Sequence, residues 1–190
     1  IAEKLEIFSK ATTPPIEVDD RVIANEETRL KYRYLDLRRP TMIKNLAFRD
    51  KCAIAARSFF HQNDFLEIET PLLVRATPEG ARDYVVPSRT VPGTFFALPQ
   101  SPQLYKQILM VAGMDKYFQF ARCLRDEDLR SDRQPEHTQM DLEMSFVTAE
   151  DIMEFVEGLF KHITKEAAGI EIKEPFVKLT YDESMKLYGT

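Results

Sequence analysis

The sequence has few of the features that define several common protein classes. Its two cysteines, Cys52 and Cys123, have no metal-ligating neighbours at the usual spacings, which argues against a disulfide framework and a zinc site. No apolar run approaches the roughly 18 residues that a membrane-spanning helix requires. We therefore expect a protein of a reducing, cytoplasmic compartment that has no membrane partner.

Glycine and net positive charge are also scarce. The six glycines are scattered along the chain, so there is no Gly-rich phosphate loop, and no G-x-S-x-G elbow indicates a hydrolase. A formal net charge of −5 argues against a surface that is basic throughout, although RNA binding through a local patch stays possible. The three histidines are far apart and show no metal-binding spacing.

What the chain does contain is ordinary globular composition, 44% apolar and 30% charged over 190 residues. Residues 1–8 alternate weakly and are interpreted as the last strand of a preceding unit. Residues 9–20 contain the run TTPP and read as an extended linker. We therefore divide the chain into residues 1–20, the end of a preceding domain plus linker, and residues 21–190, one larger domain.

Within the larger domain the hydrophobic pattern predicts alternating helices and short strands. One apolar stripe of the first long helix comprises Met42, Leu46, Ala53, Ala56 and Phe60. The expected elements are a helix at 40–61, strands at 65–70, 84–87 and 95–98, a helix from Ser101 as N-cap to Gly113, a hairpin within 120–146, a helix from Thr148 to about Ala168, and a short strand with one or two helical turns after Ile170. Because most strands follow one another at hairpin-length gaps, we predict an α+β fold, an antiparallel sheet flanked by helices.

The hairpin within residues 120–146 is the most informative segment. Its second strand alternates with period two, which is typical of a half-buried strand. The polar face comprises Gln139, Asp141, Glu143 and Ser145, and the apolar face comprises Met140, Leu142, Met144 and Phe146. Arg125 and Glu127 precede this strand at the same end of the hairpin. This convergence of one cation and several acceptors predicts a site for a zwitterionic or phosphorylated ligand.

Three further features have both a functional and a structural interpretation. Gln103 and Lys106 lie three residues apart in a first helical turn, where a cation and free backbone N–H groups favour an anion, but a solvated helix start looks the same. The loop TPEG, residues 77–80, also reads as a surface turn, and the charged loop 125–133 as a solvated face. Asp141 differs, because a carboxylate in mid-strand needs a partner or open water.

Five segments together resemble the catalytic core of class II aminoacyl-tRNA synthetases, and within them the bacterial-type aspartyl branch. They are YRYLDLRRP (32–40), FLEIETP (65–71), ATPEGARDY (76–84), LPQSPQLYKQ (98–107) and RDEDLRSDRQPEHTQMDLE (125–143). The resemblance implies ATP, L-aspartate and tRNA-Asp as substrates, with tRNA-Asn as a further option, and Mg²⁺ whose ligands lie outside this chain. It also implies a homodimer through the helix from about Met42 and the strand that ends at Pro71.

The same resemblance implies roles for individual residues. Arg125 would be the catalytic residue, in contact with the ATP α-phosphate and the substrate carboxylate, while Lys106 would meet the side-chain carboxylate. The aspartate group comprises Glu79, Ser101, Gln103, Lys106, Arg125, Gln139 and Asp141. The nucleotide group comprises Arg125, Asp126, Glu127, Gln134 and His137. His137 is a departure, because the family usually has Phe at this position.

A second departure concerns the length of the match. The family's third motif, a Gly-rich strand and helix that binds ATP, does not occur in these residues, and neither does most of the preceding anticodon-binding β-barrel. We therefore expect an incomplete catalytic core that is inactive alone. An asparaginyl or lysyl relative is the alternative within the fold, and a non-catalytic dimerisation or binding module is the alternative outside it.

Overall fold

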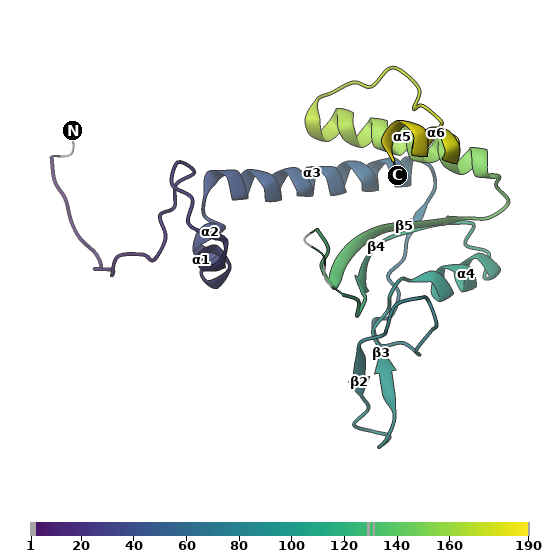
Figure 1. Cartoon of the computed structure of the whole chain (residues 1–190), viewed down its shortest axis with the longest axis horizontal. Helices are drawn as coiled ribbons and strands as arrows, with labels where there is room; N and C mark the ends of the chain where they lie inside the picture. The colour runs from purple at the N-terminus through teal and green to yellow at the C-terminus, as the bar shows by residue number, and fades with distance from the viewer. Residues whose placement is uncertain (1–2, 129, 131, 190) are drawn as a thin grey trace. The chain divides into compact units, whose positions relative to one another are not determined.

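The computed structural model describes residues 3–128, 130 and 132–189 (Figure 1). The chain divides into two compact units, Ile1–Ile54 and Ala55–Thr190, which we describe separately. Among the described residues, no helix is long and apolar enough to cross a membrane.

The first unit contains two short helices, α1 (Glu26–Lys31) and α2 (Arg33–Asp36), and the first part of α3 (Pro40–Gln62). The side chain of Asn25 caps α1 by accepting from the Thr28 N–H at 2.9 Å. Residues 3–25 form no helix or strand, so the strand expected from the weak alternation is absent from residues 3–8. A strand needs a neighbour for its backbone hydrogen bonds, and no described segment pairs with it.

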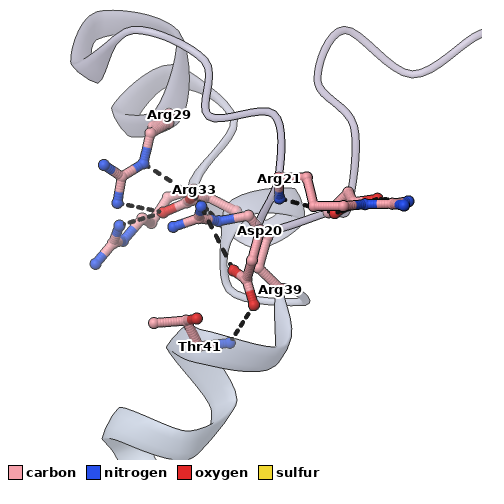
Figure 2. Close-up of polar contacts among 8 residues, drawn as sticks. Asp20, Arg21, Arg29, Arg33, Arg39 and Thr41 are labelled. Carbon is pink, nitrogen blue, oxygen red and sulfur yellow. Dashed lines mark hydrogen bonds and ion pairs between the residues drawn. The ribbon is translucent and has the colours of Figure 1, made fainter.

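A buried carboxylate organises the polar contacts of this unit. Asp36 is fully buried, and its two oxygens meet Arg29 (Nε–Oδ1, 2.9 Å), Arg33 (Nη1–Oδ2, 2.5 Å) and Arg39 (Nε–Oδ1, 3.0 Å). Arg39 also lies 3.6 Å from Asp20, which accepts a 2.9 Å hydrogen bond from the Thr41 N–H at the start of α3 (Figure 2). The cluster joins α1, α2 and α3, and the hydrogen bond from Arg29 is the main cause that lowers the pKa of Asp36.

Helix α3 forms where the sequence predicted it and ends one residue later. Only part of its apolar stripe is buried within the chain. Ala56 and Phe60 are buried, whereas Leu46 is exposed and Met42 and Ala53 are half-buried. Ile43 and Ile54, on the same side as Leu46, are exposed as well. The first four turns of α3 therefore present an uncovered apolar surface.

The second unit is built on a three-stranded sheet in the order β1-β4-β5. β4 (Lys116–Leu124) and β5 (Glu136–Met144) form the predicted antiparallel hairpin, and Gln119 lies opposite Asp141. β1 (Leu66–Glu67) pairs with β4 in parallel, so the sheet is mixed rather than wholly antiparallel. The predicted strand at 65–70 is reduced to two residues, and the α+β class is confirmed.

One face of the hairpin carries the hydrophobic core. Phe60 of α3 stacks on Phe118 of β4 at 4.2 Å between ring centroids, and Phe65 stacks on Phe155 of α5 (Ala149–Ala168) at 4.7 Å. The half-buried side chains Met140, Leu142 and Met144 of β5 pack against this cluster, as the alternation predicted. Figure 1 shows α5 on one side of the hairpin and α4 (Gln103–Val111) on the other. The second, polar face is therefore free to form a site with α4.

The remaining elements follow the predicted order with three corrections. β2 (Val85–Pro87) and β3 (Phe95–Ala97) form the expected hairpin. The N-cap of α4 is Pro102 rather than Ser101, and residues 170–180 contain no strand before α6 (Tyr181–Tyr188). Phe146 leaves the apolar face of β5, because the strand ends at Met144 and the backbone turns to φ 59°, which leaves the ring 100% exposed.

Candidate amino-acid and nucleotide site

The polar face of the hairpin and helix α4 meet in a buried charge cluster. The Lys106 ammonium lies 3.0 Å from Oδ1 of Asp141 and 3.3 Å from Oε2 of Glu143. Gln139 donates from Nε2 to the same Asp141 oxygen at 3.0 Å. Asp141 is only 3% exposed, and its Oδ2 has no hydrogen-bond partner among the described residues. Buried polar atoms normally have a hydrogen-bond partner, so this oxygen is available to accept a hydrogen bond from a ligand.

Local structure explains why these side chains converge. Asp141 and Glu143 lie two residues apart and so point to one face of β5, as the sequence predicted. Lys106 lies in the first turn of α4, next to this face. Gln103, its predicted companion, is exposed and contributes only its backbone N–H, which donates to Ser101 Oγ at 3.3 Å. The described contacts thus join Lys106 to the cluster and leave the Gln103 side chain outside it.

The loop before β2 brings a third carboxylate, that of Glu79, to the N-terminal end of α4. Ser101 donates from Oγ to Glu79 Oε2 at 2.8 Å, and Thr77 donates to Glu79 Oε1 at 3.1 Å. Glu79 and Ser101 also line a small cavity of about 30 Å³ together with Thr77, Asp83 and other residues. These contacts attach the loop of residues 77–80 to the residue that precedes the N-cap of α4.

The predicted nucleotide residues gather in a groove of about 380 Å³ at the open end of the hairpin. Its described lining residues are Arg125, Glu127, Asp128, Asp132, Arg133, Gln134, Pro135 and His137. Asp126 is not among them. It pairs instead with the loop before β2, where its N–H donates to the Arg82 carbonyl at 3.0 Å. Four of the five predicted nucleotide residues therefore share one groove.

Beneath the charge cluster lies a hydrogen-bonded layer that the sequence interpretation missed. Gln119, opposite Asp141 in the hairpin, accepts from the Tyr117 hydroxyl at 2.8 Å and from Thr70 Oγ1 at 3.0 Å. Burial, together with the nearby charges of Asp141 and Glu143, raises the pKa of Tyr117 well above its usual value, so its hydroxyl stays protonated and keeps donating. Tyr117 and Gln119 lie two residues apart in β4, opposite Glu143 and Asp141, so the period-two alternation of the first strand was the signal that could have identified them.

The cysteines and Pro71 lie outside the charge cluster and the groove. Cys123 is buried on β4 opposite His137, and burial raises the pKa of its thiol, which disfavours the thiolate that a nucleophile needs. Cys52 and Cys123 are both free. Pro71, predicted at a dimer interface, is exposed. No described group of three or more His, Cys, Asp or Glu side chains has the geometry for a metal ion.

Comparison with known proteins adds an independent line of evidence. Residues 25–190 match the family model described as tRNA synthetases class II (D, K and N). A Ruminiclostridium cellulolyticum protein named "Aspartate--tRNA ligase" is 58% identical over 190 residues, which cover 100% of this chain and 32% of that protein. A Caldanaerobacter subterraneus subsp. tengcongensis protein named "Aspartate--tRNA(Asp/Asn) ligase" is 57% identical over 189 residues, again with 100% and 32% covered. The chain thus spans about a third of the length of these relatives.

Proposed function

The chain belongs to the class II tRNA synthetases of the D, K and N type, and on this basis we propose that its protein is an aspartate–tRNA ligase. In the proposed first step, the α-carboxylate of L-aspartate attacks the α-phosphorus of ATP and pyrophosphate leaves, which gives aspartyl-adenylate. The aspartyl group then passes to the 3′ end of tRNA-Asp. Use of tRNA-Asn as well is a further outcome that charging assays would reveal.

The observation that supports aspartate as substrate is the cluster of Lys106, Asp141 and Glu143. One ammonium and two carboxylates leave a net negative charge, which favours the ammonium group of an amino acid, and Asp141 Oδ2 is still without a donor. Lys106 is the cation of this cluster and is assigned to the side-chain carboxylate. An asparagine side chain brings no carboxylate to that cation, and mismatches of this kind in a buried polar site discriminate by roughly 10⁴-fold or more.

The groove that Arg125 lines is the proposed ATP site. A guanidinium remains charged and can donate hydrogen bonds to two oxygens at once. We therefore assign Arg125 to binding the α-phosphate and the attacking carboxylate. Glu127 is assigned to the adenine amino group, Gln134 to the nucleotide, and His137 to stacking on the base. None of these side chains forms a covalent bond to the substrate in the proposed step. They act by positioning the reactants and by stabilising charge during the attack on the α-phosphorus. Mg²⁺ is expected to accompany ATP, with its ligands outside this chain.

We also propose that two copies of the protein pair through α3. Ile43, Leu46 and Ile54 recur on one side of this helix and are all exposed within the chain. An apolar stripe of this kind is commonly covered by a partner. Pro71, at the end of the segment that follows β1, is assigned to the same interface.

ATP–pyrophosphate exchange by the protein produced from its complete gene tests the proposed activity. Exchange should depend on L-aspartate and should fall by roughly 10⁴-fold or more when asparagine or lysine replaces it. Preferred exchange with asparagine or lysine would instead identify one of the other branches of the family. Absence of exchange with all three amino acids would favour a binding module without catalysis.

A further inference from the structure

Gln100 is a buried polar residue whose side-chain amide forms hydrogen bonds to the loop before β2, 17 to 19 residues earlier in the chain. It is 3% exposed and lies just before α4, next to Ser101. Its Nε2 donates to the Ala81 carbonyl at 2.8 Å and to Oδ1 of Asp83, and its Oε1 accepts from the Ala81 N–H at 3.0 Å. The amide thus makes three hydrogen bonds to two residues of the loop before β2.

These bonds lie beside the carboxylate that the loop carries. Glu79 is separated from Ala81 by Gly80, whose φ of +107° lets the backbone turn sharply between the two. Glu79 in turn accepts from Ser101 Oγ at 2.8 Å. Two consecutive residues, Gln100 and Ser101, therefore hold the loop at Ala81 and at Glu79, and the position of the Glu79 carboxylate depends on both attachments.

Gln100 also contacts the nucleotide side of the site through its backbone. Its carbonyl oxygen accepts from Arg125 Nε at 3.4 Å. The loop makes a further contact on this side, because the Arg82 carbonyl accepts from the Asp126 N–H at 3.0 Å. A substitution of Gln100 removes the side-chain bonds to the loop but keeps the backbone carbonyl that accepts from Arg125. Such a variant therefore tests the attachment of the loop while the contact with Arg125 is retained.

We propose that Gln100 is a positioning residue for Glu79, whose buried amide fixes the loop so that Glu79 faces the ammonium group of the amino-acid substrate. This inference rests on the proposed aspartate activation. Only an amide satisfies the three bonds, because it donates twice and accepts once. A carboxylate at position 100 would face the Ala81 carbonyl and Asp83 as a third acceptor, with no proton to share.

The test compares variants of the protein made from its complete gene. Gln100→Glu should raise the KM for aspartate roughly tenfold or more, through the unpaired buried acceptors, while the KM for ATP changes by less than about threefold. Adding Asp83→Asn supplies a donor to the new carboxylate and should restore most of the loss. Gln107→Glu makes the same chemical change at an exposed position of α4 and should alter neither constant.

Tryptic cleavage after Arg82 gives a readout that does not depend on activity. This arginine is exposed within the loop, and its cleavage should accelerate roughly fivefold or more in Gln100→Glu and slow again in the double variant. If both KM values rise together, or if cleavage is unchanged, Gln100 does not position Glu79. If the unaltered protein shows no aspartate-dependent exchange, the proposed function itself fails, so the two failures are distinguishable.

Discussion

At the scale of single residues, His137 is the side chain that we propose stacks on the adenine base, at a position where the related family usually has Phe. It lines the groove with Arg125 and Glu127, and an imidazole offers less stacking area than a phenyl ring. Stacked aromatic pairs contribute about 0.5–1.5 kcal/mol, so His137→Phe should lower the KM for ATP roughly two- to fivefold.

Steady-state exchange kinetics measure the KM for ATP of both proteins. Identical KM values for the unaltered protein and His137→Phe would show that His137 does not contact the base.

Residue-scale prediction succeeded where the pattern was local. The alternation from Gln139 to Met144 gave both faces of β5 because strand side chains alternate with a fixed period. Phe146 was assigned to the wrong environment, since periodicity alone does not show where a strand ends. Gln100 was not identified at all, because its partners lie 17 and 19 residues away and only the folded loop brings them together.

At the scale of elements, the Asp36 cluster joins α1 and α2 to the start of α3. Its contacts to Arg29, Arg33 and Arg39 hold the pKa of Asp36 below 3.8, the ordinary value. A lowered folded-state pKa stabilises the structure above the unfolded value and loses this effect as pH falls through the folded value. The cluster should therefore be at full strength at neutral pH and weaken only in acid below pH 3.8.

Asp36→Asn tests this expectation through hydrogen exchange of the amides in residues 26–39. Protection relative to the unaltered protein should fall roughly tenfold at neutral pH, because three guanidinium groups lose their shared carboxylate. The difference should stay constant down to about pH 5 and narrow below 3.8. Asp19→Asn, which removes an exposed pair with Arg21, is the matched control and should change little. A difference that already narrows between pH 7 and 5 would contradict the assignment.

Capping residues in the sequence predicted the ends of some helices better than those of others. The capping box of Thr148 and Asp151 and the left-handed Gly169 placed both ends of α5 correctly, because caps are short-range interactions. The start of α4 was misplaced by one residue, because Pro102 is the N-cap. Ser101 lies just outside the helix, where its Oγ accepts from the Gln103 N–H at 3.3 Å and donates to Glu79 at 2.8 Å.

At the scale of the whole molecule, the proposed pairing of two copies would cover the exposed apolar side chains of α3. Leu46→Glu places a charge in the middle of this stripe, and burying it in an interface would cost several kcal/mol. Sedimentation velocity at micromolar concentration should show a dimer for the unaltered protein and a shift toward monomer for the variant. Asn45→Glu, the neighbouring exposed position, should leave the dimer intact. A monomeric unaltered protein would refute the interface.

Long-range topology was the least predictable property at this scale. The antiparallel hairpin follows from two adjacent strands, but the parallel pairing of β1 with β4 joins residues about 50 positions apart. The predicted family and α+β class are confirmed, whereas the division into units at Ile54 cuts through a helix that the pattern treats as continuous.

The most direct test of the central claim is the aspartate-dependent ATP–pyrophosphate exchange rate of Asp141→Asn in the protein from its complete gene. Asp141→Asn should lose roughly 100-fold or more in kcat/KM for aspartate, because it removes the buried carboxylate that is proposed to meet the substrate ammonium. Glu136→Gln, an exposed change at the far end of the same strand, should stay within about twofold. Equal exchange by both variants would contradict the assignment of this cluster to aspartate.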